Sequence, residues 1–158
     1  NVCADGICRG GKRIMNQMEL SFSAKIENES FARTSVGAFI ATMNPTVDEV
    51  AEVKTIISEG VSNAIIHGYQ NDGESKVVVK VQIEENRTIK IIIQDYGKGI
   101  EDVEMARVPM YSSLKEIEHA GMGLTIIEAL CDSLEIHSTL NLGTKLTIKK
   151  RLKDSNIG

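Results

Sequence analysis

The sequence predicts a two-layer α/β sandwich, in which helices cover one face of a mixed, mostly antiparallel sheet. The first observation is the order of the periodic segments, which is strand, helix, helix, strand, strand, long loop, helix, strand, strand. The second is that short turns join the strands of two consecutive pairs, as in antiparallel hairpins. The third is the length of 158 residues, which suits one domain with its own hydrophobic core.

The first strand and the first helix follow from two different apolar spacings. From Met18 onward apolar and polar residues alternate, which predicts a half-buried strand, with its apolar residues at Leu20, Phe22, Ala24 and Ile26. Apolar residues then recur at helical spacing, at Phe31, Val36, Phe39 and Ile40. The pair Asn44-Pro45 ends this helix, because a residue before proline avoids helical backbone angles.

A second helix and a hairpin come next. Thr46 or Asp48 is expected to cap the helix, which should run to about His67 and end at Gly68. Alternating Val and Ile residues then predict two strands, over 77–83 and 89–93, with a hairpin loop between them.

The last part of the chain begins with a long segment without sustained periodicity, residues 97–120. Loops of this length inside a compact domain are usually functional, so we expect a lid here. A helix is then expected over 122–131, followed by two strands near 133–140 and 144–151 that a turn at 141–143 joins.

Composition narrows the class of protein. The formal net charge of -4 argues against a nonspecific nucleic-acid binder, and the absence of Trp argues against a base-stacking surface. The sequence has no apolar run of the ~20 residues that a membrane-spanning helix needs and no visible signal peptide. Three cysteines make no disulfide framework, so a cytoplasmic location is expected.

Residues 1–14 have neither strand nor helix periodicity, so we expect a disordered extension or a tag that ends before Met15 or Met18. Cys3 and Cys8 could be half of a metal site, but no second ligand pair lies near them in the sequence. The domain is therefore expected over residues 15–153, followed by a short tail over 154–158.

The first set of candidate functional residues is Glu59, Asn63 and His67, which are spaced by four and project from one face of the second helix. An amide oxygen is a suitable ligand for Mg²⁺, and a carboxylate one turn away can accept a proton from an attacking hydroxyl. Taken alone, the same spacing also fits a solvated polar stripe on an amphipathic helix.

The second set is Asp95-Tyr96-Gly97-Lys98-Gly99, directly after an apolar strand. The glycines permit tight turns and close approach of the backbone to a ligand, although a plain hairpin turn explains this motif equally well in isolation. Asp95 could accept a hydrogen bond from an amino group at the mouth of a pocket.

The third set is Gly121-Met122-Gly123-Leu124, which is expected to open a helix and so to expose N–H groups that bind anions. No Gly-Lys-Ser/Thr follows, so this is not a Walker motif. The fourth set, Gly143-Thr144, enters the last strand and by itself indicates only a turn.

In this order, the four sets resemble the ATP-binding motifs of the superfamily of gyrase, Hsp90, histidine kinases and MutL, called GHKL or Bergerat ATPases. Three stretches carry a closer resemblance to the anti-sigma-F family of endospore-forming bacteria, and a looser one to anti-sigma-B switch kinases: residues 28–33, 58–69 and 121–123. The resemblance implies a homodimeric, ATP-dependent protein serine kinase. It would inhibit a sporulation sigma factor and phosphorylate an anti-anti-sigma protein.

The resemblance also implies a role for each candidate residue. Glu59 would be the general base, Asn63 the ligand of Mg²⁺, and Asp95 the acceptor for the adenine amino group of ATP or ADP. Further residues would line the nucleotide pocket or support Asp95: His67, Gly97, Gly99, Ile100, Gly121, Met122, Gly123, Leu124 and Thr144. Arg33, on the first helix, would lie at the partner-binding surface.

One position departs from the family pattern. Relatives tend to place an arginine just before the glycine pair, where this chain has Glu118-His119-Ala120. A neutral histidine holds phosphate more weakly than arginine does, although the nearby Lys115 could substitute.

Two other functions are therefore weighed. The first is a nucleotide-sensing anti-sigma protein without efficient kinase activity, which the histidine would favour. The second is a histidine-kinase catalytic domain, which would need an upstream helical hairpin with a phosphorylatable histidine.

Overall fold

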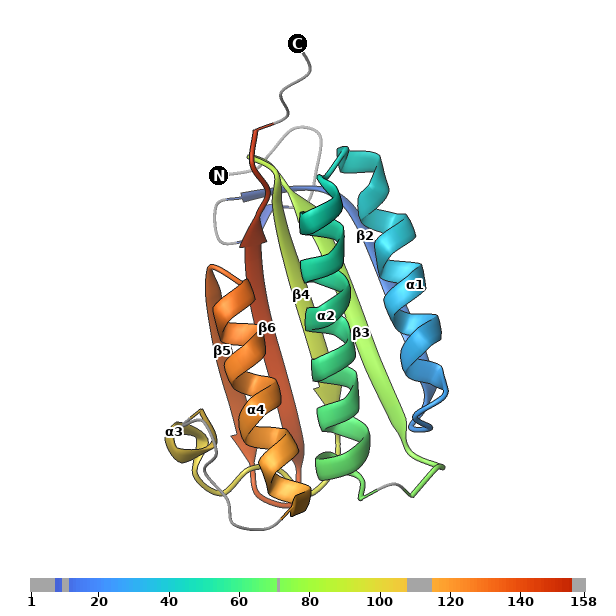
Figure 1. Cartoon of the computed structure of the whole chain (residues 1–158), viewed down its shortest axis with the longest axis vertical. Coiled ribbons are helices and arrows are strands. Elements are labelled where there is room, and N and C mark those ends of the chain that lie inside the picture. Colours follow the sequence, from blue (N-terminus) through green and yellow to red (C-terminus); the bar gives the residue numbers. More distant parts are fainter. Residues whose placement is uncertain (1–7, 10–11, 71, 108–114, 155–158) are drawn as a thin grey trace.

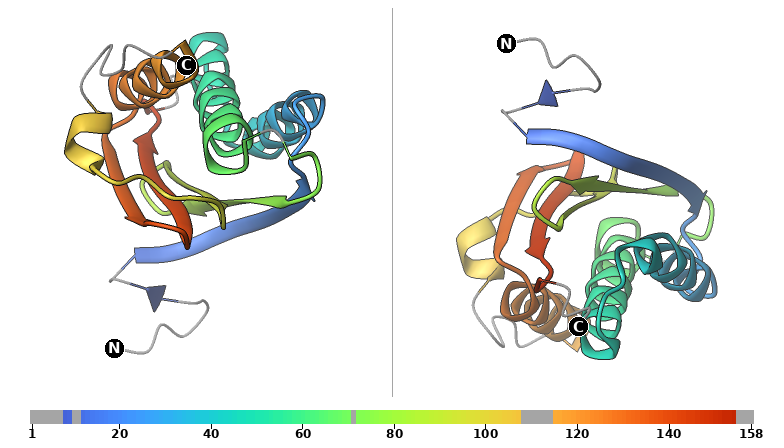
Figure 2. Two further views of the ribbon diagram at one scale, coloured as in Figure 1. Left: turned by 90° about the horizontal axis from the view of Figure 1, so that it is seen from below. Right: turned by 90° about the horizontal axis from the view of Figure 1, so that it is seen from above.

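The structure is a computed structural model that describes residues 8–9, 12–70, 72–107 and 115–154. Its sheet has six strands in the order β1-β2-β3-β4-β6-β5, and every neighbouring pair is antiparallel. The long helices α1, α2 and α4 all lie on one face of this sheet (Figures 1 and 2). The predicted two-layer α/β sandwich is confirmed, with an antiparallel sheet in place of a mixed one.

The elements follow one another in nearly the predicted order. The strands are β1 (Cys8–Arg9), β2 (Lys12–Ser23), β3 (Lys76–Glu84), β4 (Thr88–Asp95), β5 (Ser133–Thr139) and β6 (Gly143–Arg151). The helices are α1 (Asn28–Ile40), η1 (Ala41–Met43), α2 (Val47–Asn63), η2 (Ala64–Gly68), α3 (Val103–Ala106) and α4 (Lys115–Leu130). No helix in these described ranges is long and apolar enough to cross a membrane.

Strand β2 differs from its prediction at both ends. It begins at Lys12, three residues before the expected domain start at Met15, and it ends at Ser23 rather than near Ile26. Pairing with two strands defines this start, because Lys12 lies opposite Arg9 of β1 and the ladder with β3 runs from Ile14 opposite Glu84 to Ser23 opposite Lys76. The exposed polar residues Asn16 and Gln17 interrupt the alternation in the sequence that would otherwise have indicated the longer strand.

Helix α2 starts as predicted at a cap on Thr46. The Thr46 side chain accepts a hydrogen bond from the N–H of Glu49 at 3.1 Å, and the Glu49 carboxylate accepts one from the N–H of Thr46 at 2.9 Å. This reciprocal pair satisfies two donors that a helix start otherwise leaves free. The helical path continues to Gly68, but its last turn is the π-helix η2.

The sequence predicts a lid with short helical pieces, and a short helix, α3, does lie within it. The segment is more helical than expected because α4 begins at Lys115 instead of near Met122. Residues 108–114, and the side chains of 115–121, lie outside the described part of the structure. The expected helix start at Gly121-Met122-Gly123 is therefore wrong. Glycine is unfavourable inside helices, but α4 packs along α2, and this packing outweighs the local preference.

Candidate functional site

The end of α2 and the turn η2 line a pocket of about 270 Å³. Its lining residues are Glu59, Ser62, Asn63, Ile66 and His67. The structure thus brings together the three residues that their spacing of four placed on one helix face. The π-turn at Ala64–Gly68 widens the helix between Asn63 and His67, yet both side chains still face this pocket. A π-turn inside a helix is often found at a functional site.

Asn63 has a buried polar atom that could bind a ligand. Its side chain is 9% exposed, and its amide oxygen Oδ1 is buried without a hydrogen-bond partner among the described residues. A buried polar atom that stays unsatisfied destabilises the fold by about 1–3 kcal/mol, so such atoms call for an explanation. An oxygen of this kind can coordinate a hard cation such as Mg²⁺.

Glu59 lies against α4. A β-carbon added at Gly123 would be 3.2 Å from the carboxylate oxygen Oε2 of Glu59, so glycine leaves room for this carboxylate. Gly121 and Gly123 lie inside α4, so the expected helix start at these glycines is wrong. Their contact with the nucleotide phosphates stays a prediction.

The two residues beside Gly123 differ in exposure. The Leu124 side chain is fully buried in the hydrophobic core and does not face the Asn63 pocket, in contrast to its expected place at the nucleotide. Met122 is 41% exposed and is available to a ligand.

Asp95 ends β4 as predicted and is buried, with 4% of its surface exposed. Its carboxylate accepts a hydrogen bond from the N–H of Gly97 at 3.0 Å. Burial raises the pKa of Asp95 above its usual value, and the backbone N–H groups of Gly97 and Thr144 offset only part of that rise. Thr144 lies opposite Asp95 in the β4–β6 ladder, and its support of a nucleotide-binding Asp95 stays a prediction.

Glycines let three chain segments meet around Asp95. A β-carbon at Gly68 would be 2.7 Å from Oδ1 of Asp95, and one at Gly97 would collide with the carbonyl of Gly68. Gly99 has a φ of +75°, and a β-carbon there would collide with the carbonyl of Thr139. The turn η2 thus joins the Asn63 pocket to Asp95, because the carbonyl of Gly68 also accepts a hydrogen bond from the N–H of Lys98, at 2.9 Å.

Ser138 is a site residue that the sequence analysis missed. Its hydroxyl oxygen accepts a hydrogen bond from the N–H of Ile100 at 2.7 Å and lies 2.8 Å from the hydroxyl of Thr144. Ser138 therefore holds Ile100 to strands β5 and β6, next to Asp95. A serine in an alternating strand carries no signal of this role, which depends on the pairing of β5 with β6.

Arg33 lies apart from the pocket, on α1. Its guanidinium is 3.2 Å from the carboxylate of Glu29 and 3.5 Å from the hydroxyl of Ser58, the residue before Glu59. The side chain remains 41% exposed, so it can still contact a partner. The expected contribution of His119 falls on a side chain outside the described part of the structure.

Comparison with known proteins shows which family the chain resembles. Residues 22–150 match the family described as "Histidine kinase-like ATPase domain". The chain is 49% identical over 140 residues to the anti-sigma F factor of Anoxybacillus flavithermus, which covers 89% of this chain and 95% of that protein. It is 50% identical over 137 residues to the anti-sigma F factor of Clostridium perfringens, which covers 87% of this chain and 97% of that protein.

The chain belongs to the anti-sigma F factor family. It is an anti-sigma factor with a kinase-like ATPase domain, as the resemblance of its motifs predicted. A domain of this family binds ATP and ADP, so the adjoining Asn63 pocket and buried Asp95 lie in a nucleotide-binding domain.

Solved structures agree with this anti-sigma F factor fold. The crystal structure of the RsbU and RsbW domains of a Mycobacterium tuberculosis protein matches 87% of this chain and 33% of that one, with a TM-score of 0.64 and 22% identity. A histidine kinase domain from Erythrobacter litoralis matches 67% of this chain and 46% of that one, with a TM-score of 0.51 and 18% identity. At these identities the likeness shows the fold alone.

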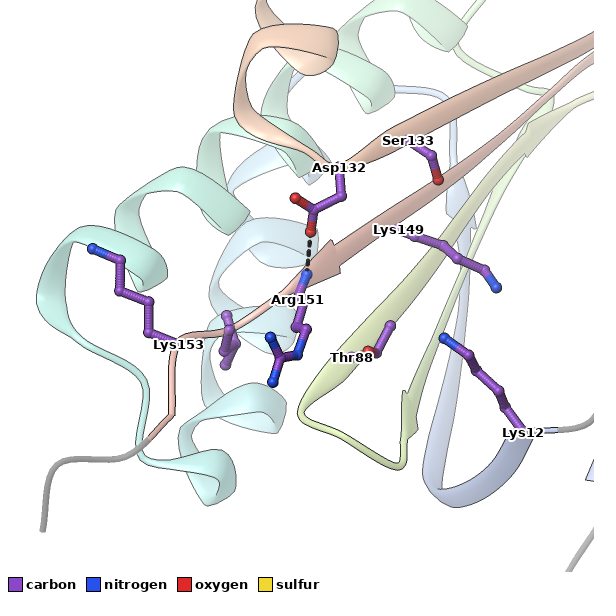
Figure 3. A pocket seen from close by; sticks show the side chains of 8 residues that line it. Lys12, Thr88, Asp132, Ser133, Lys149, Arg151 and Lys153 are labelled. Carbon is purple, nitrogen blue, oxygen red and sulfur yellow. Dashed lines mark hydrogen bonds between the residues drawn. The ribbon is translucent and has the colours of Figure 1, made fainter.

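The chain also has a basic pocket of about 430 Å³, at the end of the sheet opposite Asp95 and Thr144 (Figure 3). It is lined by Lys12, Thr88, Asp132, Ser133, Lys149, Arg151, Leu152 and Lys153. The Arg151 guanidinium donates to the carbonyl of Asn86 at 3.2 Å and pairs with Asp154 at 3.3 Å. Lys149 lies 3.9 Å from the buried carboxylate of Glu84. These contacts hold the β3–β4 hairpin and the C-terminal segment against β6. The basic residues Arg151 and Lys149 therefore have a structural role that explains their presence in this pocket.

Proposed function

We propose that the chain is an ATP-dependent serine kinase that also binds and inhibits a sporulation sigma factor of the sigma-F type. Its substrate would be a serine of an anti-anti-sigma protein. The observation that carries the kinase proposal is the pocket at the end of α2, where the Glu59 carboxylate and the unsatisfied Oδ1 of Asn63 face one space beside the buried Asp95. The printed name of the relatives supports the sigma-factor part.

The residues present fit Mg²⁺ bound together with a nucleotide. The described residues contain no group of three or more His, Cys, Asp or Glu side chains that could hold a metal ion by themselves. Mg²⁺ commonly keeps several waters and takes one or two protein ligands together with substrate phosphates. Asn63 would be such a ligand, and the bound ion would neutralise charge on the phosphates.

Within this site the residues would divide the work. Asp95 would accept a hydrogen bond from the adenine amino group, and Gly97 and Gly99 would let the backbone approach the base. Glu59 would orient the substrate serine and accept its proton as the hydroxyl attacks the terminal phosphate. Phosphoryl transfer depends mainly on positioning and charge neutralisation, so a side chain that aligns the hydroxyl contributes strongly.

The partner surface would include Arg33. Its position beside Ser58 puts a half-exposed cation next to the residue that precedes Glu59. A protein docked there could present a serine to the pocket or respond to the nucleotide bound in it. We also propose that the chain acts as a homodimer in the cytoplasm, as the resemblance to the anti-sigma-F family implies.

Substitution of Glu59 tests the kinase proposal. Glu59→Gln keeps the size of the side chain but removes the base, so phosphorylation of a purified anti-anti-sigma protein should fall by about 100-fold or more. ADP binding, measured by titration calorimetry, should stay within about twofold of the unmodified chain. Transfer of labelled phosphate from ATP at the normal rate by Glu59→Gln would show that Glu59 is not the base.

The same assay distinguishes the alternative function. The residue His119 favours a nucleotide-sensing anti-sigma protein without efficient kinase activity, because relatives tend to place an arginine there. That protein would bind a sigma factor in a nucleotide-dependent way and transfer no phosphate. Rapid transfer by the unmodified chain would exclude it.

A further inference from the structure

We propose that Tyr69 is a positioning residue for recognition of the base, and that its hydroxyl holds the loop after Asp95 in the shape that binds adenine. This inference rests on the proposed contact between Asp95 and the adenine amino group.

The Tyr69 hydroxyl joins three segments of the chain. It donates a hydrogen bond to the carbonyl of Lys76 at 2.6 Å and accepts one from the N–H of Tyr96 at 2.7 Å. Tyr69 directly follows η2, Lys76 begins β3, and Tyr96 directly follows β4. One phenol oxygen therefore ties the end of the π-turn and the start of one strand to the end of another.

The hydrogen bond from Tyr96 fixes the peptide group between Asp95 and Tyr96. The next N–H along the chain, that of Gly97, donates to the Asp95 carboxylate, and the N–H of Lys98 donates to the carbonyl of Gly68. Tyr69 thus starts a run of three consecutive anchored N–H groups. Without its oxygen the Tyr96 N–H would lose its acceptor, and the orientation of the carboxylate that meets the base would be less well defined.

The environment of Tyr69 keeps this hydroxyl protonated. The ring is half-buried and packs against the hydrophobic core, and burial raises the pKa of the phenol above its usual value. Near neutral pH the hydroxyl therefore donates its hydrogen bond to the carbonyl of Lys76 and accepts one from the N–H of Tyr96. Phenylalanine would retain the packing and remove both hydrogen bonds.

Tyr69→Phe tests this role with two nucleotides. We expect the Kd for ADP to rise about tenfold, the size of one lost hydrogen bond to a well-placed group. The Kd for GDP should change by less than about twofold, because guanine has no amino group at the position of the adenine one. With ATP the Michaelis constant should rise by a similar factor while kcat stays nearly constant, since Glu59 and Asn63 are not disturbed.

Two further variants make the test specific. Tyr96→Phe removes a neighbouring phenol whose side chain is 62% exposed and leaves the Tyr96 N–H in place, so its effect on the Kd for ADP should be far smaller. Asp95→Ala followed by Tyr69→Phe completes a double-mutant cycle. The second substitution should then change the Kd for ADP by less than about twofold, because the side chain that Tyr69 positions is gone.

The outcomes separate the inference from the function on which it rests. If the unmodified chain binds ADP and Tyr69→Phe binds it equally well, the role of Tyr69 is refuted and the nucleotide site stands. If Tyr69→Phe loses ADP and GDP affinity equally and melts at a lower temperature, Tyr69 stabilises the fold and has no specific role in recognising adenine. If Asp95→Ala binds ADP normally, the proposed contact with adenine fails, and the positioning role fails with it.

Discussion

At the scale of single residues, the chemistry proposed for this site depends on groups that the fold leaves partly unsatisfied. The buried Oδ1 of Asn63 has no partner among the described residues, and Asp95 is a buried carboxylate that accepts a hydrogen bond from the N–H of Gly97. Both arrangements oppose folding in the absence of a ligand. Such residues are retained where function needs them, which makes them good positions at which to test the nucleotide site.

The substitution Asp95→Asn should weaken ADP binding by about tenfold or more. An amide has a single acceptor oxygen, so its NH2 group would face one of the donors that now contact the carboxylate, or the adenine amino group itself. Titration calorimetry at neutral pH measures the change. Asp154→Asn, an exposed residue at the other end of the sheet, is the matched control. Unchanged affinity in Asp95→Asn would remove Asp95 from the base pocket.

At the scale of elements, the start of α2 is fixed by Glu49. Its carboxylate accepts hydrogen bonds from the N–H of Thr46, at 2.9 Å, and from the N–H of Lys153, at 2.8 Å. Burial is the largest single influence on its pKa and raises it. The hydrogen bonds to Thr46 and Lys153, with the nearby charge of Arg87, outweigh burial, so the pKa of Glu49 lies below its usual value.

The lowered pKa predicts how stability depends on pH. The contribution of Glu49 is fully present above the unfolded pKa of 4.5 and is lost as the pH falls through the lower folded pKa. Glu49→Ala should therefore lower the free energy of unfolding by about 2 kcal/mol at pH 7, and the difference from the unmodified chain should shrink in acid. Urea denaturation at several pH values measures both effects.

Asp48→Ala is the control for this element. Asp48 is an exposed acid in the same first turn, so its loss should lower the free energy of unfolding by only about 0.3–1 kcal/mol. A Glu49→Ala effect no larger than that of Asp48→Ala would show that the capping box does not hold the helix start.

At the scale of the whole molecule, the two layers are joined by a cation as well as by apolar packing. Lys150 lies on β6, and its ammonium group pairs with Glu52 of α2 at 2.6 Å and donates to the carbonyl of Leu130, at the end of α4, at 2.7 Å. Its side chain is only 11% exposed. One lysine therefore connects the sheet with both helices that carry the nucleotide site.

Lys150→Met should lower the free energy of unfolding by about 1–3 kcal/mol, because the carbonyl of Leu130 and the carboxylate of Glu52 lose a buried donor. Thermal and urea unfolding measure this loss. ADP affinity below the melting range should stay nearly constant, because β6 carries Lys150 and Thr144 toward opposite ends of the sheet.

The matched control for this variant is Lys145→Met, which changes an exposed lysine on the same strand. It should shift the free energy of unfolding by no more than about 0.5 kcal/mol. Equal effects of the two substitutions would contradict the proposed link between the layers.

Much of the fold was predictable because its signals are local. Alternation of Val and Ile in β3 and β4, the cap at Thr46 and the turn before β6 each act within a few residues. The start of β2 and the length of α4 were not predictable, since pairing with β1 and β3 and packing on α2 decide them. A local rule cannot weigh a contact made by residues far away in the chain.

The candidate site divides in the same way. The sequence by itself predicted which residues would carry the chemistry, because Glu59, Asn63 and His67 share a helix face and Asp95 follows an apolar strand. Only the tertiary structure decided how they meet. The turn η2 brings Gly68 against Asp95, Gly123 makes room for Glu59 from within α4, and the hydroxyls of Tyr69 and Ser138 anchor the loop between Asp95 and Ile100. These contacts join segments distant in sequence, and their energy exists only once the sheet and helices have packed.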